Sequence, residues 1–148
     1  MKVEMDMFIG EYQNSIDAKG RVIIPSKFRD GLGYHFILTK GFDNCLIIYT
    51  MDEWERFREK LSALPKANKE ARSLVRYVTS GAVECELDKQ GRLTIPQNLR
   101  EYARISKDLV TIGTMDNVEI WSKEVYDEFC SDNMCDESVA EKMAEFGI

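Results

Sequence analysis

The amino-acid sequence predicts an α+β fold in which two copies of one unit share a β-barrel, with helices on its outside. Two observations lead to this prediction. A segment of the chain occurs twice, and each copy carries about four short strand patterns followed by helical patterns. A unit with so few strands has an apolar face that it cannot cover alone, so the two units are expected to pack as a pseudo-symmetric pair.

The duplication is visible as two aligned segments. Residues 17–29 align with residues 88–100 at an offset of 71, and six positions are identical. The similarity continues downstream, where residues 41–50 match residues 114–122. The identical pairs are Asp17/Asp88, Gly20/Gly91, Arg21/Arg92, Ile24/Ile95, Pro25/Pro96 and Arg29/Arg100.

The duplication divides the chain into four segments. Residues 11–54 form repeat 1, residues 55–81 a helical linker, residues 82–125 repeat 2, and residues 126–148 an acidic C-terminal helical tail.

Each repeat is predicted to begin with a β-hairpin. In repeat 1, β-branched and aromatic residues at Phe8–Ile16 and Arg21–Ile24 flank the turn Asp-Ala-Lys-Gly. Repeat 2 shows the same order, with Val83–Leu87 and Arg92–Ile95 around the turn Asp-Lys-Gln-Gly. A proline then ends the second strand, and in repeat 1 Ser26 is expected to cap a short helical turn.

The two turns share an aspartate and a glycine, to which we assign structural roles. Aspartate can accept hydrogen bonds from backbone N–H groups two residues on, and glycine adopts positive φ without a steric cost. An acidic side chain would also repel a phosphate, so these aspartates are not expected to contact a nucleic acid. The structural turn residues are Asp17, Gly20, Asp88 and Gly91.

Two further strands and then helices are predicted in each repeat. Thr50 with Glu53 has the spacing of a capping box at the start of one helix, and Pro65 stops that helix. Asn68 is expected to cap a second helix that ends near Gly81. The predicted strand pairs are His35–Thr39 with Leu46–Tyr49 and Leu109–Gly113 with Val118–Trp121, and the predicted tail helices are Ser122–Cys130 and Glu137–Phe146.

The length and composition exclude several classes of protein. With 148 residues, 44% hydrophobic and 31% charged, the chain can form one compact domain or two lobes but not a large multidomain enzyme. No apolar run is long enough to span a membrane, and residues 1–6 lack the apolar stretch of a signal peptide. We therefore expect a cytoplasmic protein without a membrane partner.

The sequence offers little to catalysis or metal binding. The cysteines lack the Cys-Xaa-Xaa-Cys spacing of a zinc site, and His35 is the single histidine of the chain. We expect no catalytic residue, no metal and no cofactor, and hence no enzyme. The cysteines, expected to be reduced structural thiols, are Cys45, Cys85, Cys130 and Cys135.

The net charge of -6 conceals an uneven distribution. Residues 116–148 carry 2 positive and 10 negative side chains, a net of -8, so residues 1–115 carry +2. The segments Gln13–Asp30 and Asp88–Arg104 each hold four cations against two carboxylates. The repeated turns are therefore the basic part of an acidic protein, and this distribution favours a nucleic acid as partner.

The cations of these two segments are the candidate DNA contacts. A two-stranded β-ribbon can enter the major groove of DNA, where arginine can donate two parallel hydrogen bonds to guanine, and a lysine at a turn suits phosphate oxygens. The candidates are Lys19, Arg21, Lys27 and Arg29 in repeat 1, and Lys89, Arg92 and Arg100, with Arg104 nearby, in repeat 2.

The spacing of Asp17 and Arg21 also fits a purely structural pair, in which the arginine bonds back to the aspartate and stabilises the turn. In repeat 2, Gln90 and Asn98 replace two of the repeat 1 lysines. The first hairpin is therefore the better candidate for direct contact, and the second is expected to be mainly architectural.

Several segments together resemble the MraZ family of bacterial transcriptional regulators of the division and cell-wall gene cluster. The segments are Met7–Tyr12, Asp-Ala-Lys-Gly-Arg-Val-Ile-Ile-Pro at 17–25, Gly-Phe-Asp-Asn-Cys-Leu at 41–46, the Trp54 helix, the second Asp-Xaa-Xaa-Gly-Arg-Leu-Xaa-Ile-Pro at 88–96, and Glu-Ile-Trp at 119–121. The resemblance covers nearly the whole chain, and residues 1–6 precede it.

The resemblance implies a duplicated SpoVT-AbrB-like swapped-hairpin β-barrel with peripheral helices. It also implies a ring-shaped homo-oligomer, associated with the nucleoid, that binds direct repeats in promoter DNA upstream of its own operon, usually as a repressor. Arg21, and by the repeat Arg92, would be needed for DNA contact.

A protein-interaction module that does not bind DNA is the alternative reading. Antitoxins that use a barrel of this type usually have one barrel unit and a disordered tail, whereas this chain has two units and a tail with helical spacing. The apolar residues Val139, Met143 and Phe146 of that tail are expected to form a docking face for the chain's own barrel or for a neighbouring subunit.

Overall fold

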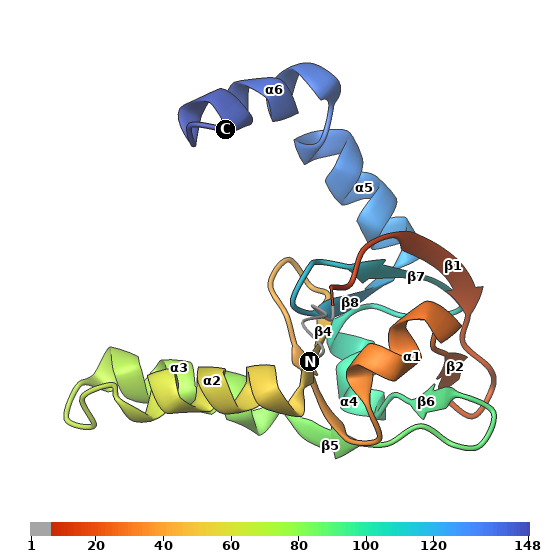
Figure 1. The fold of residues 1–148 in the computed structure, drawn as a ribbon, viewed down its shortest axis with the longest axis horizontal. Coiled ribbons are helices and arrows are strands. Elements are labelled where there is room, and N and C mark those ends of the chain that lie inside the picture. The colour runs from red at the N-terminus through yellow and green to blue at the C-terminus, as the bar shows by residue number, and fades with distance from the viewer. Residues whose placement is uncertain (1–6) are drawn as a thin grey trace, which may run out of the picture.

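The computed structural model describes residues 7–148, so the expectations for residues 1–6 lie outside it (Figure 1). Within this range the chain forms eight strands and six helices, which confirms the α+β class. The strands are β1 (Glu11–Ser15), β2 (Arg21–Ile23), β3 (Phe36–Lys40), β4 (Leu46–Thr50), β5 (Val83–Cys85), β6 (Arg92–Thr94), β7 (Asp108–Gly113) and β8 (Val118–Ser122). The helices are α1 (Ser26–Leu32), α2 (Met51–Ser62), α3 (Lys69–Ser80), α4 (Gln97–Tyr102), α5 (Lys123–Asn133) and α6 (Asp136–Glu145).

The described strands form two antiparallel sheets that combine both repeats. The larger sheet has six strands in the order β1-β7-β8-β4-β3-β5, and the smaller one pairs β2 with β6. The counterpart strands of the two repeats are β1/β5, β2/β6, β3/β7 and β4/β8. If each strand is exchanged for its counterpart, the strand order of the larger sheet is reversed and the smaller pair is unchanged. The two repeats are therefore related by a pseudo-two-fold axis that passes between β4 and β8.

The prediction that each repeat opens with a self-paired hairpin is wrong. The chain does reverse at the predicted turn, where the Asp17 N–H donates to the Arg21 carbonyl at 2.9 Å. The strands on either side then separate, because β1 pairs with β7 and β2 pairs with β6. In the same way β5 pairs with β3 of repeat 1. This exchange covers the apolar faces that neither repeat can bury alone.

The hydrophobic core lies between these strands and the short helices α1 and α4. Phe28 on α1 and its counterpart Leu99 on α4 are 2% and 1% exposed. Val22 and Leu93, which lie opposite each other in the β2–β6 pair, point into the same core. The small β2–β6 sheet thus has one buried face and one face open to solvent.

Capping residues explain where the helices begin. Thr50 accepts a hydrogen bond from the Glu53 N–H at 3.1 Å, and Asn68 accepts one from the Ala71 N–H at 3.0 Å, which confirms both predicted caps. Ser26 is not a cap: α1 already begins at Ser26, and Pro25 occupies the N-cap position. Pro25 has φ of -52° and ψ of 135°, the extended backbone that is typical of a residue just before a helix.

The remaining helices extend away from the sheets in two directions. Figure 1 shows α2 and α3 side by side, projecting to one side of the body, and α5 leading to α6 above it. Stacking of Tyr49 on Phe57, with ring centroids 5.3 Å apart, attaches α2 to β4, and contact of Trp121 with Tyr126 and Phe129 attaches α5 to β8. Among residues 7–148, no helix combines the length and the apolar character needed to cross a bilayer.

Candidate nucleic-acid interface

The solvent face of the β2–β6 sheet presents one arginine from each repeat. Arg21 pairs with Thr94, and Arg92 pairs with Ile23, so all four side chains project from the same face, opposite to the buried Val22 and Leu93. Arg21 and Arg92 are diagonal neighbours, which places them roughly 7–8 Å apart. We call Arg21, Ile23, Arg92 and Thr94 the ribbon face.

An aspartate in each turn orients these arginines. Arg21 Nε donates to Asp17 Oδ2 at 2.8 Å, and Arg92 Nε donates to Asp88 Oδ2 at 2.7 Å. The side chains of the two arginines are equally exposed, at 27% each. Since Nε makes the bond to the carboxylate, the terminal nitrogens of each guanidinium remain for a ligand outside the chain.

The same carboxylates hold the turns together. Asp17 Oδ1 accepts from the backbone N–H groups of Lys19 and Arg21, both at 2.9 Å, and Asp88 makes the equivalent bonds in repeat 2. The hydrogen bond from the Arg21 N–H is the main reason that the pKa of Asp17 lies below its ordinary value of 3.8, with partial desolvation opposing it and the Arg21 side chain adding to it. The pKa of Asp88 is lowered by the same interactions with Arg92 and Gln90.

These lowered pKa values predict a loss of stability in acid. A carboxyl with a lower pKa in the folded protein stabilises it above the unfolded pKa, and this contribution disappears as the pH falls through the folded pKa. We expect Asp17→Asn with Asp88→Asn to lower the melting temperature at pH 7. The melting temperature of this variant should also fall less than that of the wild type as the pH is lowered below about 4. Circular dichroism melts across this range measure both effects.

The matched control is Asp30→Asn, which removes an exposed carboxylate of α1 outside both turns. An unchanged melting temperature and an unchanged acid decline in the double variant would show that the turns do not depend on these carboxylates.

Each turn glycine lies against an arginine of the other repeat. Gly20 and Gly91 have φ of +80° and +77°, a region that disfavours other residues. A Cβ at Gly91 would lie 2.6 Å from Arg29 Nε, and one at Gly20 would lie 3.1 Å from Arg100 Cζ. The glycines therefore permit both the turn and the close packing of the two repeats.

This packing separates the candidate cations into two groups. Arg29 Nε donates to the Ile24 carbonyl at 2.8 Å, and Arg29 and Arg100 are partly covered by the opposite turns. Exposed lysines lie at the turns and at the start of α1, and Arg104, also exposed, follows α4. The exposed lysines among the candidates are Lys19, Lys27 and Lys89.

The ribbon face includes two residues that the sequence analysis did not single out. Ile23 is 45% exposed although it is apolar, and Thr94 is also exposed. The signal in the sequence was the two-residue period of a strand, which places residues 21 and 23 on one face and residues 92 and 94 on one face. It becomes informative only once β2 is known to pair with β6. Asn14 from β1 supports this strand, since its Nδ2 donates to the Ile23 carbonyl at 2.9 Å.

Two of the cysteines have raised pKa values. Burial raises the pKa of Cys85 to about 11 and raises the pKa of Cys45 further, so neither is a ready thiolate. In the part of the chain that the structure describes, His, Cys, Asp and Glu form no cluster of three or more that could hold a metal ion.

Fold and site together define an internally duplicated α+β protein whose two repeats jointly present a cationic ribbon. Comparison with known proteins agrees with the internal duplication. The family model described as "MraZ protein, putative antitoxin-like" matches twice, over residues 7–77 and 78–146.

Curated relatives align over almost the full length. Proteins named Transcriptional regulator MraZ from Clostridium beijerinckii and Acetivibrio thermocellus are each 57% identical, over 142 and 143 residues, which is 96% of this chain and 100% of each relative. The protein of that name from Clostridium tetani is 57% identical over 142 residues, with the same coverage. The chain belongs to the MraZ family, whose members carry the name of transcriptional regulators.

Proposed function

We propose that this protein is a sequence-specific DNA-binding regulator that represses the bacterial division and cell-wall gene cluster, including its own operon. The ribbon face supports this proposal most strongly, because it presents Arg21 and Arg92 from both repeats on one exposed surface. The names of the curated relatives support a role in transcription.

The ribbon face has the shape and chemistry to read a base sequence. The major groove is about 12 Å wide and admits a two-stranded ribbon, and arginine bonds to guanine through two donors. Ile23 offers an apolar contact to a thymine methyl group, and Thr94 offers a hydroxyl. The lysines at the turns, Lys19 and Lys89, would bind phosphate oxygens and position the ribbon without reading the sequence.

The exchange of strands between repeats supports a swapped-hairpin barrel of the SpoVT-AbrB type, in which β2 and β6 close one side. A barrel of this kind presents few cations, so one copy would bind DNA weakly. A ring of copies that engages consecutive direct repeats gains affinity through effective concentration, by factors of roughly 100 to 10,000. We therefore propose a ring-shaped homo-oligomer on promoter DNA, located in the cytoplasm and associated with the nucleoid.

A mobility-shift titration with the DNA immediately upstream of the gene tests this function. We expect a shift that an unrelated fragment of equal length does not show, and an affinity that falls with salt at a slope of about -0.9 for each phosphate contact. Footprinting should show protected direct repeats whose spacing matches the spacing of subunits. Equal affinity for the two fragments would contradict sequence-specific regulation.

The antitoxin-like wording of the family description keeps a protein-interaction role as a second candidate. A complex of the protein with another cellular protein at 1:1 stoichiometry, together with no preference for the upstream DNA, would favour that role instead.

A further inference from the structure

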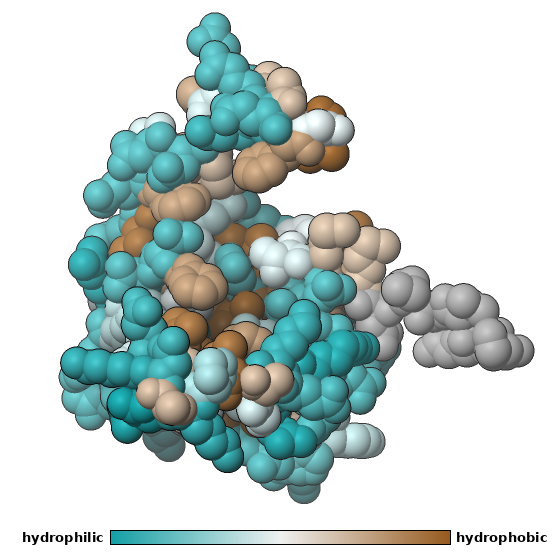
Figure 2. All heavy atoms as spheres, turned by 90° about the vertical axis from the view of Figure 1, so that its left-hand side faces the viewer, coloured by the Kyte–Doolittle hydropathy of each residue, from teal (hydrophilic) through white to brown (hydrophobic). Residues whose placement is uncertain are grey.

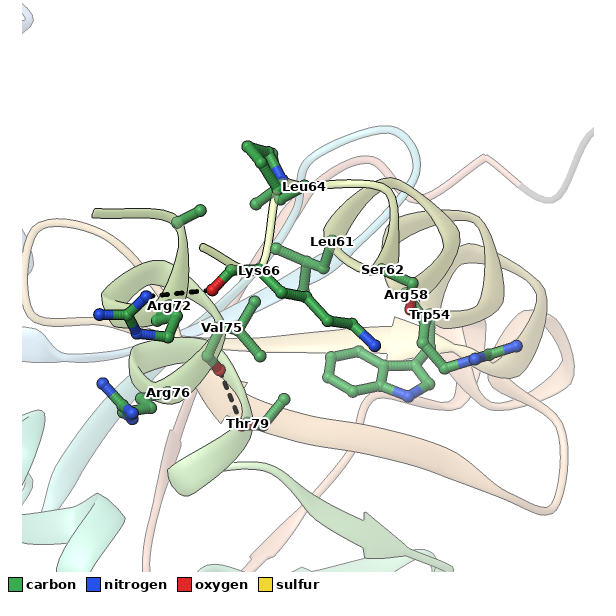
Figure 3. Close-up of a pocket in the computed structure, with 12 residues that line it drawn as sticks. Trp54, Arg58, Leu61, Ser62, Leu64, Lys66, Arg72, Val75, Arg76 and Thr79 are labelled. Atoms are coloured by element: carbon green, nitrogen blue, oxygen red, sulfur yellow. Dashed lines mark hydrogen bonds between the residues drawn. The ribbon is translucent and has the colours of Figure 1, made fainter. Parts of the chain in front are cut away.

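An apolar groove lies between α2 and α3, far from the ribbon face. It encloses about 450 Å³ and lies open on one side. Trp54 and Leu61 of α2 and Val75 of α3 line it, with Leu64 at the connection between the helices. Figure 3 shows Leu61 and Val75 projecting into the space between the two helices. An apolar groove between two helices fits an amphipathic helix.

The rim of this groove is basic. Its charged lining residues are all cations, one from α2, one from the connection and two from α3. Glu55 pairs with the α2 cation Arg58, and the α3 cation Arg72 donates to the Lys66 carbonyl at 3.0 Å. Figure 3 shows the Arg72 and Arg76 side chains on the side of α3 away from Val75, so they border the groove from outside it. Figure 3 shows Lys66 extending along the groove towards the Trp54 ring. The rim cations are Arg58, Lys66, Arg72 and Arg76.

The second repeat carries the counterpart of this helical pair, with the opposite charge. Residues 51–80, which include α2 and α3, have a net charge of +2, whereas residues 123–148, which include α5 and α6, have a net charge of -6. Figure 1 shows that the two pairs leave the body in different directions, so they do not meet within one copy. Two complementary surfaces are thus displayed by every chain.

The last helix has an apolar face that the described chain leaves uncovered. No residue of α6 is buried, and Met143 and Phe146 are 48% and 80% exposed. With Val139 they follow the spacing i, i+4, i+7, which is the pattern of anchors for a helix in a groove. Carboxylates flank these anchors at Glu141 and Glu145. Figure 2 shows this end of the chain projecting above a face whose central hydrophobic surface is bordered by hydrophilic residues.

We infer that the α2–α3 groove of one copy binds the α6 helix of a second copy. The apolar anchors Val139, Met143 and Phe146 fill the groove, and the carboxylates of α6 face the cations of its rim. The groove and the helix are different surfaces of the same chain, so the contact is head-to-tail and can propagate from copy to copy until it closes. This inference rests on the proposed homo-oligomer and names the surfaces that build it.

One substitution on α6 and a matched control test the contact in the full-length protein. Phe146→Ser is expected to raise the dissociation constant between copies by roughly tenfold or more, because a large aromatic anchor is lost. Phe42→Ser removes a phenylalanine that is equally exposed, at 82%, on the β3–β4 connection, and should leave the assembly unchanged. Light scattering over a concentration series gives the mass of each variant.

A mixing experiment shows whether the contact is head-to-tail. Lys66→Glu with Arg76→Glu changes two exposed cations and blocks the groove but keeps the α6 helix, whereas Phe146→Ser blocks the helix but keeps the groove. At a concentration below the raised dissociation constants each variant alone should be monomeric, and an equal mixture, which retains one intact groove and one intact helix, should form a 1:1 dimer in native mass spectra. Melting temperatures close to the wild-type value verify that both variants are folded.

The outcomes separate this inference from the proposed function. If Phe146→Ser keeps the wild-type mass, or if the mixture forms no dimer, the groove does not bind α6 of a second copy. This result leaves the proposed ring and the proposed DNA contacts unaffected. If the wild-type protein is monomeric at every concentration, both the ring and this contact are overturned. A mobility shift with a single DNA repeat reports on the ribbon face in each case, since Arg21 and Arg92 are intact in these variants.

Discussion

Substitution of Arg21 by alanine is expected to reduce affinity for the upstream DNA by about 1–3 kcal/mol, or roughly 5- to 150-fold at fixed salt. The guanidinium lies on the ribbon face and is oriented by Asp17 at 2.8 Å, so its loss removes a preorganised donor. Because each copy of a ring contributes the same arginine, the loss on an operator with several repeats should exceed the loss on one repeat. Fluorescence anisotropy with one and with several repeats measures both values.

Two further variants identify the origin of this effect. The control is Arg56→Ala, which removes an arginine of α2 that is 61% exposed and paired with Glu53. It should leave DNA affinity nearly unchanged. Arg92→Ala should cause a smaller loss than Arg21→Ala, since Gln90 replaces Lys19 beside it. Normal binding by Arg21→Ala, with an unchanged oligomeric mass, would exclude the ribbon face as the DNA-binding surface.

Substitution of Phe28 by alanine is expected to lower the free energy of unfolding by about 3–5 kcal/mol. This residue is 2% exposed, and its ring packs edge-on against Phe8 and Tyr12 with centroids 5.8 and 5.3 Å apart. Alanine would leave a cavity where α1 meets the N-terminal segment. Urea unfolding at constant protein concentration measures the change, because association between copies makes stability depend on concentration.

The control for this prediction is Phe42→Ala, which removes the same ring from an exposed position. Its cost should be below about 0.5 kcal/mol, as is usual for surface sites. A loss below about 1 kcal/mol in Phe28→Ala would show that the core relaxes around the missing ring.

Local signals in the sequence predict most of the secondary structure. The caps at Thr50 and Asn68 lie where the sequence places them, because a cap depends on residues within one helical turn. The Asp17–Arg21 pair also follows from spacing alone. The strand partners do not, since β1 and β2 flank a well-formed turn and yet each pairs with the other repeat. Pairing is decided by which arrangement buries more apolar surface, and no local pattern reports that.

The candidate site, like the fold, could be predicted from the sequence only in part. Sequence comparison of the two repeats identifies Arg21 and Arg92 as equivalent, but it gives no sign that they share one face. It also treats Arg29 and Arg100 like the other cations, whereas in the structure they pack against Gly91 and Gly20 of the opposite repeat. Ile23 and Thr94 were missed because an exposed position is recognised only from the partner strand.

The exchange of strands between repeats also determines when strands can pair during synthesis. Asn14 in β1 pairs with Leu109, which is added to the chain 95 residues later. At about 5–20 residues per second, β1 therefore waits roughly 5–20 seconds on the ribosome for its own partner. During that interval the first repeat displays unpaired strand edges, and another nascent chain emerging nearby from the same messenger offers identical ones. A second nascent chain is thus expected to compete with the chain's own β7 for pairing with β1.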